Sequence, residues 1–366
     1  MMGQQQGVAM AKRVIVIGAG IIGAAIALGL SRAGMQVTVL EAATPATGAT
    51  GRSFGWINAS FHQDKAHFHL RNQAIAAWHR LEGVLPRAAL RWCGCLCWEH
   101  EGPALTAQAA ELEALGYAVE RLDAAAFAKR EPQVRAPAEC LSFPTEAVAE
   151  PVAVTRAMLR LAGDHGAKLI EGVAATAICT GAGRVQGVQT AQGMMAADHV
   201  IVAAGVAAPA LLVPVGVALP MLPRPGLMLR SQALPPLLRH VCVCPEMEFR
   251  QDAKGHLLAP TAASHQSDRT EVIQDRPEDL ADAALVRLQR QLPGVALRWE
   301  AVMLAARPVP QDGLPVIGAA GPEGLYLAVM HSGVTLAALV GEAVCQEVAQ
   351  GQVAAGLGAY RPQRFA

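Results

Sequence analysis

Three glycines stand at the spacing that binds the phosphates of a dinucleotide. Gly18, Gly20 and Gly23 follow an apolar run at residues 14–17 and precede a segment rich in Ala and Leu. In a strand–turn–helix unit the first glycine permits the tight turn, the second lets the backbone approach a pyrophosphate, and the third lets the helix pack on the strand. The helix N-terminus then offers N–H groups to the phosphates. The pattern therefore predicts a dinucleotide site.

An acidic residue at the end of the second predicted strand narrows the choice of dinucleotide. Residues 36–40 alternate between polar and apolar types and are followed by Glu41. A carboxylate at this position accepts hydrogen bonds from a ribose 2′-hydroxyl and repels a 2′-phosphate. The sequence therefore disfavours NADP.

A membrane segment is the alternative interpretation of the N-terminal region. Residues 14–31 form an uncharged run, about as long as a bilayer-spanning helix requires. The clustered glycines and the amphipathic strand that follows argue against it, and no cleavage-like polar segment indicates a secretory signal. A second uncharged run at 200–223 contains four prolines, which would interrupt a spanning helix. We expect no integral membrane segment.

Length and charge limit the class of protein. A chain of 366 residues is long enough for two domains. The formal net charge is zero, so nothing indicates nucleic acid or an anionic membrane as a partner. The hydrophobic fraction of 52% with only 4% aromatic residues suits tightly packed layers of helix on sheet.

The cysteines and histidines do not have the spacing of a metal site. Cys93, Cys95 and Cys97 alternate, which predicts that all three lie on one face of a strand. No CxxC pair occurs among the eight cysteines, so we expect reduced thiols in a cytoplasmic protein. His67 and His69 diverge on a helix, so a metal site that includes them and His62 is disfavoured.

Hydrophobic periodicity predicts alternating helices and strands along the chain. Helices are expected at 64–85, 105–115, 151–165, 277–291 and 333–348. Strands are expected at 14–17, 36–40, 90–98, 117–122, 168–180, 185–190, 199–204 and 324–330. The nearly all-apolar strand 199–204, closed by Gly205, suits a central parallel position.

Several segments together resemble the FAD-dependent D-amino-acid oxidase superfamily, which includes glycine oxidase, sarcosine oxidase and D-amino-acid dehydrogenases. The shared marks are VIVIGAGIIG with VTVLE, GATGRSFGWIN, HVIVAAG, and RPVPQDGLPVIG with GLYLAVMHSGVTLA. The resemblance implies an α/β fold: a Rossmann-type FAD-binding domain of glutathione-reductase-like topology and a second, mostly antiparallel substrate domain. The FAD-binding domain would comprise 1–85, 148–216 and 305–366, and the substrate domain 86–147 and 217–304.

The resemblance also implies which residues hold FAD, without a covalent bond. The pyrophosphate would lie on the glycine turn with Ile21 and Ile22, the adenosine ribose on Glu41 and Ala42, and the adenine on the backbone of Val173. The ribityl chain and the ring would contact a set from three further segments: Thr50, Gly51, Ser53, Gly55, Trp56, Ala204, Gly205, Gly333, Val334 and Thr335. The N–H groups of 333–335, at a helix N-terminus, would face the flavin O2 region.

The same resemblance implies oxidation of the C–N bond of an amino acid or secondary amine. Arg307 would bind the substrate carboxylate, since a planar guanidinium suits two parallel hydrogen bonds; the alternative is a surface arginine in a Pro-rich loop. His331 would tune the flavin charge or assist amine deprotonation, or is a packed neutral histidine. Arg250 is either a second anion contact or a solvated strand residue.

Other functions stay open at the level of sequence. A flavin and an arginine would also serve a 2-hydroxy acid, and the chain could be the flavin subunit of a multi-subunit dehydrogenase or a nicotinamide-dependent dehydrogenase. The turn Met330–Gly333 lacks an arginine that relatives often carry there, which leaves the substrate open. The electron acceptor would be O2 or a quinone, and a homo-oligomer is compatible with the sequence.

Overall fold

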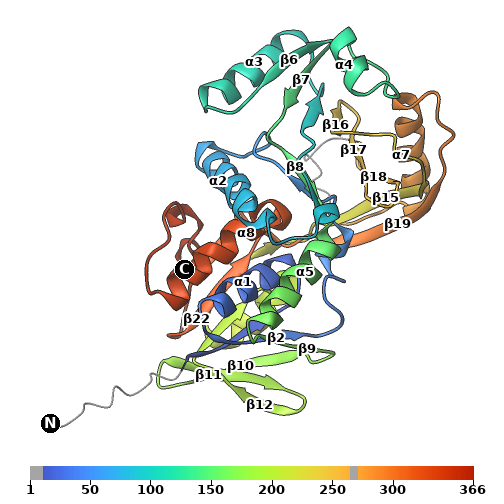
Figure 1. The fold of residues 1–366 in the computed structure, drawn as a ribbon. Helices are drawn as coiled ribbons and strands as arrows, with labels where there is room; N and C mark the ends of the chain where they lie inside the picture. The colour runs from blue at the N-terminus through green and yellow to red at the C-terminus, as the bar shows by residue number, and fades with distance from the viewer. Residues whose placement is uncertain (1–10, 264–270) are drawn as a thin grey trace.

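The structure, a computed structural model, describes residues 11–263 and 271–366. Two large sheets lie at opposite ends of the molecule and are joined by short strands (Figure 1). One sheet has six strands and the other has eight. The α/β fold with a mostly antiparallel second sheet is confirmed.

The six-stranded sheet has the order β21-β22-β13-β1-β2-β9, parallel except for β21. Its strands are β1 (Arg13–Ile17), β2 (Gln36–Glu41), β9 (Lys168–Glu171), β13 (His199–Val202), β21 (Val316–Ala319) and β22 (Leu325–Val329). The central strand β1 is apolar on both faces, as a covered parallel strand must be. Val14 and Val16 belong to one core cluster, and Ile15 and Ile17 belong to another.

Helices cover one face of this sheet and a small sheet covers the other (Figure 1). The helices are α1 (Ile21–Arg32), α5 (Pro151–Asp164) and α8 (Gly333–Val344). The small sheet comprises β10 (Ala175–Gly181), β11 (Arg184–Thr190) and β12 (Gly193–Ala196), and α6 (Ala208–Leu212) packs beside it. The predicted strand 168–180 was wrong in one respect. It divides at Gly172, whose φ of 71° ends β9 before β10 begins in the other sheet.

The eight-stranded sheet has the order β19-β15-β18-β17-β16-β5-β7-β6, antiparallel except between β16 and β5. Its strands are β5 (Cys95–Cys97), β6 (Glu120–Asp123), β7 (Glu139–Phe143), β15 (Pro225–Ala233), β16 (Val241–Cys244), β17 (Met247–Gln251), β18 (His256–Pro260) and β19 (Trp299–Ala306). Apolar residues of α4 (Ala124–Arg130) and α7 (Pro277–Gln291) pack in one core cluster with its strands. The strand expected at 117–122 begins only at Glu120, because the Tyr117 N–H bonds back to the Leu112 carbonyl oxygen at the end of α3.

Short strands and two helices connect the large sheets. β3 (Trp56–Ile57) and β4 (Leu90–Arg91) both pair with β8 (Ala147–Ala149), and β14 (Met221–Leu222) pairs with β20 (Val309–Pro310). The helix α2 (Lys65–Glu82) packs on α8, and α3 (Gly102–Ala114) packs in the same core cluster. The predicted strand 90–98 is wrong as a single element: Gly94, with φ of 70°, separates β4 from β5.

The cysteines are free thiols, as the sequence predicted. Cys95 and Cys97 are buried on one face of β5, but Cys93 precedes the strand, so the prediction of three cysteines on one strand face was wrong for Cys93. Burial raises the pKa of the Cys95 and Cys97 thiols. Among the described residues no group of three potential ligands could hold a metal ion. Within 11–263 and 271–366, no helix is both long and apolar enough to cross a bilayer.

Glycines allow a close contact between α1 and α8, and this contact can be tested. A Cβ on Gly341 of α8 would lie 2.7 Å from the Ala25 carbonyl oxygen of α1. Gly341→Ala therefore forces the two helices apart, and we expect a loss of about 1–3 kcal/mol in the free energy of unfolding. Gly163→Ala in α5 is the matched control, because a Cβ there meets no atom within 4 Å, and it should stabilise the chain by about 0.4–1 kcal/mol. Urea unfolding measures both; equal effects would contradict the close α1–α8 contact.

Candidate active site

A cavity of about 2010 Å³ is lined by both large sheets. Residues of β1, β2 and α8 line it from the six-stranded sheet, and residues of β15, β18 and β19 line it from the eight-stranded sheet. It exceeds the volume of roughly 300–1,000 Å³ typical of a pocket for a drug-sized ligand. An extended dinucleotide and a small substrate can therefore share it.

Residues of the glycine turn line this cavity. Gly18 has φ of 104°, and a Cβ there would lie 2.6 Å from the Ala203 carbonyl oxygen. Gly18, Gly20, Ile21 and Ile22 line the cavity, whereas Gly23 lies beneath the turn, where a Cβ would approach the Gly18 oxygen to 1.9 Å. The turn thus presents backbone, with no side chain at the glycines, to whatever fills the cavity. These residues fit a dinucleotide pyrophosphate.

Glu41 ends β2 on the cavity wall, next to Ala42. Its Oε2 accepts a hydrogen bond from the Ala19 N–H at 2.8 Å, and its Oε1 accepts one from the Ala43 N–H at 2.9 Å. Each carboxylate oxygen has a further lone pair for a ribose hydroxyl. Val173 donates its N–H to the Glu41 carbonyl at 2.9 Å, but it is not among the described lining residues. Its contact with adenine stays a prediction.

The segment 54–58 contributes to the cavity wall, and three of its alternate carbonyl oxygens accept hydrogen bonds from side chains. The Phe54 oxygen accepts from Arg250 Nε of β17, the Trp56 oxygen from the Thr335 hydroxyl of α8, and the Asn58 oxygen from Arg71 Nε of α2. The last two distances are 3.1 and 3.0 Å. Side chains from β17, α8 and α2 therefore fix this segment of the cavity wall.

The predicted residues of this region lie at the wall with one exception. Thr50, Ser53, Gly55 and Trp56 line the cavity. Gly51 is not among the described lining residues, and a Cβ there would lie 2.4 Å from the Ala46 carbonyl oxygen. Gly51 therefore shapes the loop from behind.

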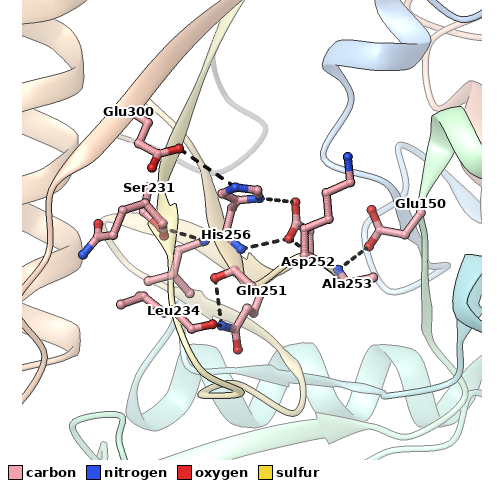
Figure 2. Close-up of polar contacts among 12 residues, drawn as sticks. Glu150, Ser231, Leu234, Gln251, Asp252, Ala253, His256 and Glu300 are labelled. Atoms are coloured by element: carbon pink, nitrogen blue, oxygen red, sulfur yellow. Dashed lines mark hydrogen bonds and ion pairs between the residues drawn. The ribbon is translucent and has the colours of Figure 1, made fainter.

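Arg250 supports the wall and is not solvated, so that interpretation was wrong. Its side chain is fully buried, and Nη1 donates to Glu150 Oε1 at 3.1 Å. Glu150 Oε1 also accepts from the Ala253 N–H at 3.1 Å, in the hairpin turn between β17 and β18 (Figure 2). Arg250 is not among the described residues that line the cavity. The guanidinium of Arg250 connects Glu150 and the β17–β18 hairpin to the segment 54–58. The structure therefore gives no support for the alternative prediction that Arg250 binds an anion.

Three hydrogen-bond donors surround the carboxylate of Glu146, and one of them is the indole of Trp56. The carboxylate accepts from Trp56 Nε1 and the Tyr117 hydroxyl, both at 2.9 Å, and from the Ser60 N–H at 3.3 Å. The side chain is fully buried. Burial raises the pKa of Glu146 to about 7, because the three donors offset only part of the desolvation of its charge.

The N-terminus of α8 lines the cavity, and so do Ala204 and Gly205, which follow β13. Gly333, Val334 and Thr335 form the first turn of α8. Trp78 of α2 donates its indole N–H to the Val334 and Thr335 carbonyl oxygens at 3.1 and 2.9 Å. This contact fixes the direction of the helix end, whose dipole favours negative charge.

Arg307 and His331 also line the cavity. Arg307 follows β19 and donates from Nε to the Arg224 carbonyl and from Nη2 to the Pro225 carbonyl, both at 3.2 Å. Burial and the positive charges of Arg307 and Arg71 lower the pKa of His331 to about 4. His331 is therefore neutral at neutral pH, which leaves it as a hydrogen-bonding group without charge.

Sequence reasoning missed Arg71, Glu146 and Asn58. Arg71 carried a detectable signal, because it lies at helical spacing between Phe68 and Ile75 on the apolar face of the predicted helix 64–85. A charge within an apolar stripe needs a partner when it is buried. Glu146 had no such signal, since its three donors come from distant segments.

The titration of Glu146 gives a testable dependence of stability on pH. Its pKa rises from 4.5 to about 7 on folding, so between these values the folded chain holds a proton that the unfolded chain has lost. Its contribution to stability therefore falls as pH rises through this window. Glu146→Gln removes the titration, so the variant's unfolding free energy relative to wild type should increase by on the order of 1 kcal/mol or more between about pH 5 and 8.

Urea unfolding at several pH values measures this difference. Thr106→Ala, at an exposed position of α3, is the control; it changes no ionisable group, so its difference from wild type should be constant with pH. The account of Glu146 is contradicted if its own difference is also constant.

Comparisons with known proteins agree with this geometry. The chain is 33% identical over 152 residues to glycine oxidase from Pseudomonas putida, which covers 41% of this chain and 40% of that protein. It is 27% identical over 234 residues to D-amino acid dehydrogenase from Rhizorhabdus wittichii, with coverages of 60% and 54%. The matches therefore span about half the length of these curated relatives.

The fold is shared along almost the whole chain. The crystal structure of glycine oxidase from Geobacillus kaustophilus superposes with a TM-score of 0.84 at 24% identity and covers 97% of this chain and 99% of that one. The sequence model of the FAD dependent oxidoreductase family matches residues 13–347. As the resemblance in the sequence predicted, the chain therefore belongs to the FAD dependent oxidoreductase family.

Proposed function

We propose that this protein is an FAD-dependent enzyme that oxidises the C–N bond of an amino acid or secondary amine. The observation that carries the proposal is that one cavity joins the glycine turn and the N-terminus of α8 to Arg307 and His331. Family membership supplies the cofactor, and the relatives' names, glycine oxidase and D-amino acid dehydrogenase, indicate the substrate class.

FAD would be held without a covalent bond. Its pyrophosphate would lie on Gly18, Gly20 and the first turn of α1, and its ring between the segment 54–58 and the N-terminus of α8. Neither Cys179 nor Cys345 is among the described residues that line the cavity, which supports non-covalent binding. When bound, FAD supplies the acceptor for a hydride from the substrate Cα.

Arg307 and His331 would bind the substrate. The Arg307 guanidinium gives a fork that suits a carboxylate, and its backbone is fixed by the Arg224 carbonyl at 2.9 Å. His331, with its low pKa, is a weak base and remains neutral. It would therefore accept or donate a hydrogen bond at the amine, and it adds no positive charge that would repel the substrate nitrogen.

The wider organisation is proposed on the same basis. Every strand of the six-stranded sheet falls within 1–85, 148–216 and 305–366, which we propose as the FAD-binding domain. The eight-stranded sheet falls within 86–147 and 217–304, except for the end of β19 at 305–306.

Free thiols suit a reducing compartment such as the cytoplasm. The electron acceptor would be O2 or a quinone, and assembly into a homo-oligomer is compatible with the proposal.

Arg307→Met tests the proposed carboxylate contact. Loss of the fork should lower kcat/KM for an amino acid substrate by about 10²–10³-fold, since losing the partner of a buried charge costs roughly 2–5 kcal/mol. Anaerobic bleaching of the flavin absorbance by D-amino acids, glycine derivatives, opines and 2-hydroxy acids both identifies the substrate and gives the rate.

The control is Arg298→Met, an exposed arginine just before β19, which should leave the rate unchanged. Bleaching of the wild-type flavin by 2-hydroxy acids alone would overturn amine oxidation. An Arg307→Met rate equal to that of wild type would overturn the role of Arg307.

A further inference from the structure

Arg71 is a buried cation for which the proposed chemistry has so far no use. It lies in α2 with only 2% of its surface exposed. Nε and Nη2 donate to the Asn58 carbonyl and side-chain oxygens, and Nη1 donates to Ser332 Oγ at 2.8 Å. All three acceptor oxygens belong to neutral groups.

The charge of Arg71 is not neutralised by direct contact. Among the described residues no carboxylate forms an ion pair with it, and Glu146 acts on it only at longer range. Burial lowers the pKa of Arg71 to about 10, so the group stays cationic at neutral pH. An ion in such a place costs free energy unless a nearby negative charge offsets the cost.

Ser332 connects this charge to the end of α8. Ser332 has a left-handed backbone with φ of 57°, and its side chain makes no hydrogen bond that caps the helix. Its hydroxyl accepts from Arg71 instead. A Cβ on the next residue, Gly333, would lie 3.4 Å from Ile22 at the start of α1. Arg71 is therefore on the side of the cavity that carries the cofactor-binding turns, and its charge adds to the positive end of the α8 dipole.

We propose that Arg71 is a positioning residue that raises the electron affinity of the bound flavin. This inference rests on the proposed FAD binding. Hydride transfer breaks the substrate Cα–H bond, moves two electrons and one proton to the ring, oxidises the amine to an iminium, and leaves one net negative charge on the ring. A fixed cation near the ring stabilises that charge without reorganisation, and the same contacts hold Asn58 and Ser332 in place.

The low exposure of Arg71 argues against a role in binding the substrate carboxylate. A guanidinium that bound a substrate carboxylate would present its N–H groups to the cavity, as a two-point carboxylate contact requires. Arg71 lies at the cavity wall, but it turns three of its five N–H groups to Asn58 and Ser332, and almost none of its surface is open. Its effect must therefore act through charge and through the residues that it holds.

Arg71→Gln and Arg71→Lys provide the test, because both can hydrogen-bond to Asn58 and Ser332 but only Lys keeps the charge. The readouts are the midpoint potential of the bound flavin, from equilibration with a reference dye, and the dissociation constant of sulfite for the oxidised flavoprotein. Arg71→Gln should weaken sulfite binding at least tenfold and lower the potential by about 30 mV, the equivalent of tenfold for two electrons. Arg71→Lys should retain most of the wild-type sulfite affinity and most of the wild-type midpoint potential.

Arg80→Met is the matched control. Arg80 lies in the same helix and pairs with Glu342 of α8 at 2.6 Å, but it is exposed and outside the cavity. It should leave both readouts at their wild-type values. A purified wild-type protein that binds no FAD would refute the proposed function itself.

With FAD bound to the wild type, three results would overturn the inference about Arg71 alone. The first is a wild-type potential and sulfite affinity in Arg71→Gln. The second is an equal loss in Arg71→Lys, which would assign the effect to packing. The third is loss of FAD by both variants, which would assign Arg71 to assembly of the site.

Discussion

The site depends on the fixation of one short piece of backbone, the segment 54–58, by side chains from three other elements. Its alternate carbonyl oxygens face Arg250 of β17, Thr335 of α8 and Arg71 of α2. A strand of two residues, such as β3, has too few ladder hydrogen bonds to be rigid by itself. The three donors supply what the ladder lacks. They also connect this part of the wall to the eight-stranded sheet through Arg250 and to α8 and α2 through Thr335 and Arg71.

Burial has a different consequence for each charged group around this segment. Arg250 is offset by Glu150, which also binds the β17–β18 turn, so this pair acts as a structural link. His331 is neutral because burial, with a further contribution from two nearby guanidinium groups, lowers its pKa, and Glu146 has a pKa of about 7 because its three donors do not fully offset burial. Arg71 keeps its charge, and among the described residues no carboxylate forms an ion pair with it. Arg71, which contacts Ser332 just before α8, therefore adds positive charge to this part of the cavity wall.

Local patterns predicted the parts of the fold that depend on local physics. The glycine turn, the flanking strands and the helices at 151–165 and 277–291 were correct because turn geometry and periodicity determine them. Predicted strands failed where a glycine with positive φ divides an apolar run between two sheets, as at Gly94 and Gly172. Apolar periodicity does not change at such a point. Arg250 and Glu146 could not be assigned because their partners lie about 100 and 90 residues away, whereas Arg71 was detectable as a charge in an apolar helix face.

The most direct test of the account is the visible absorption spectrum of the purified protein, before and after incubation of the chain with FAD. The account predicts the absorption bands of an oxidised flavin at about one FAD per chain, released on denaturation because the cofactor is held without a covalent bond. A colourless protein that takes up no FAD would contradict the assignment of the cavity and every role derived from it.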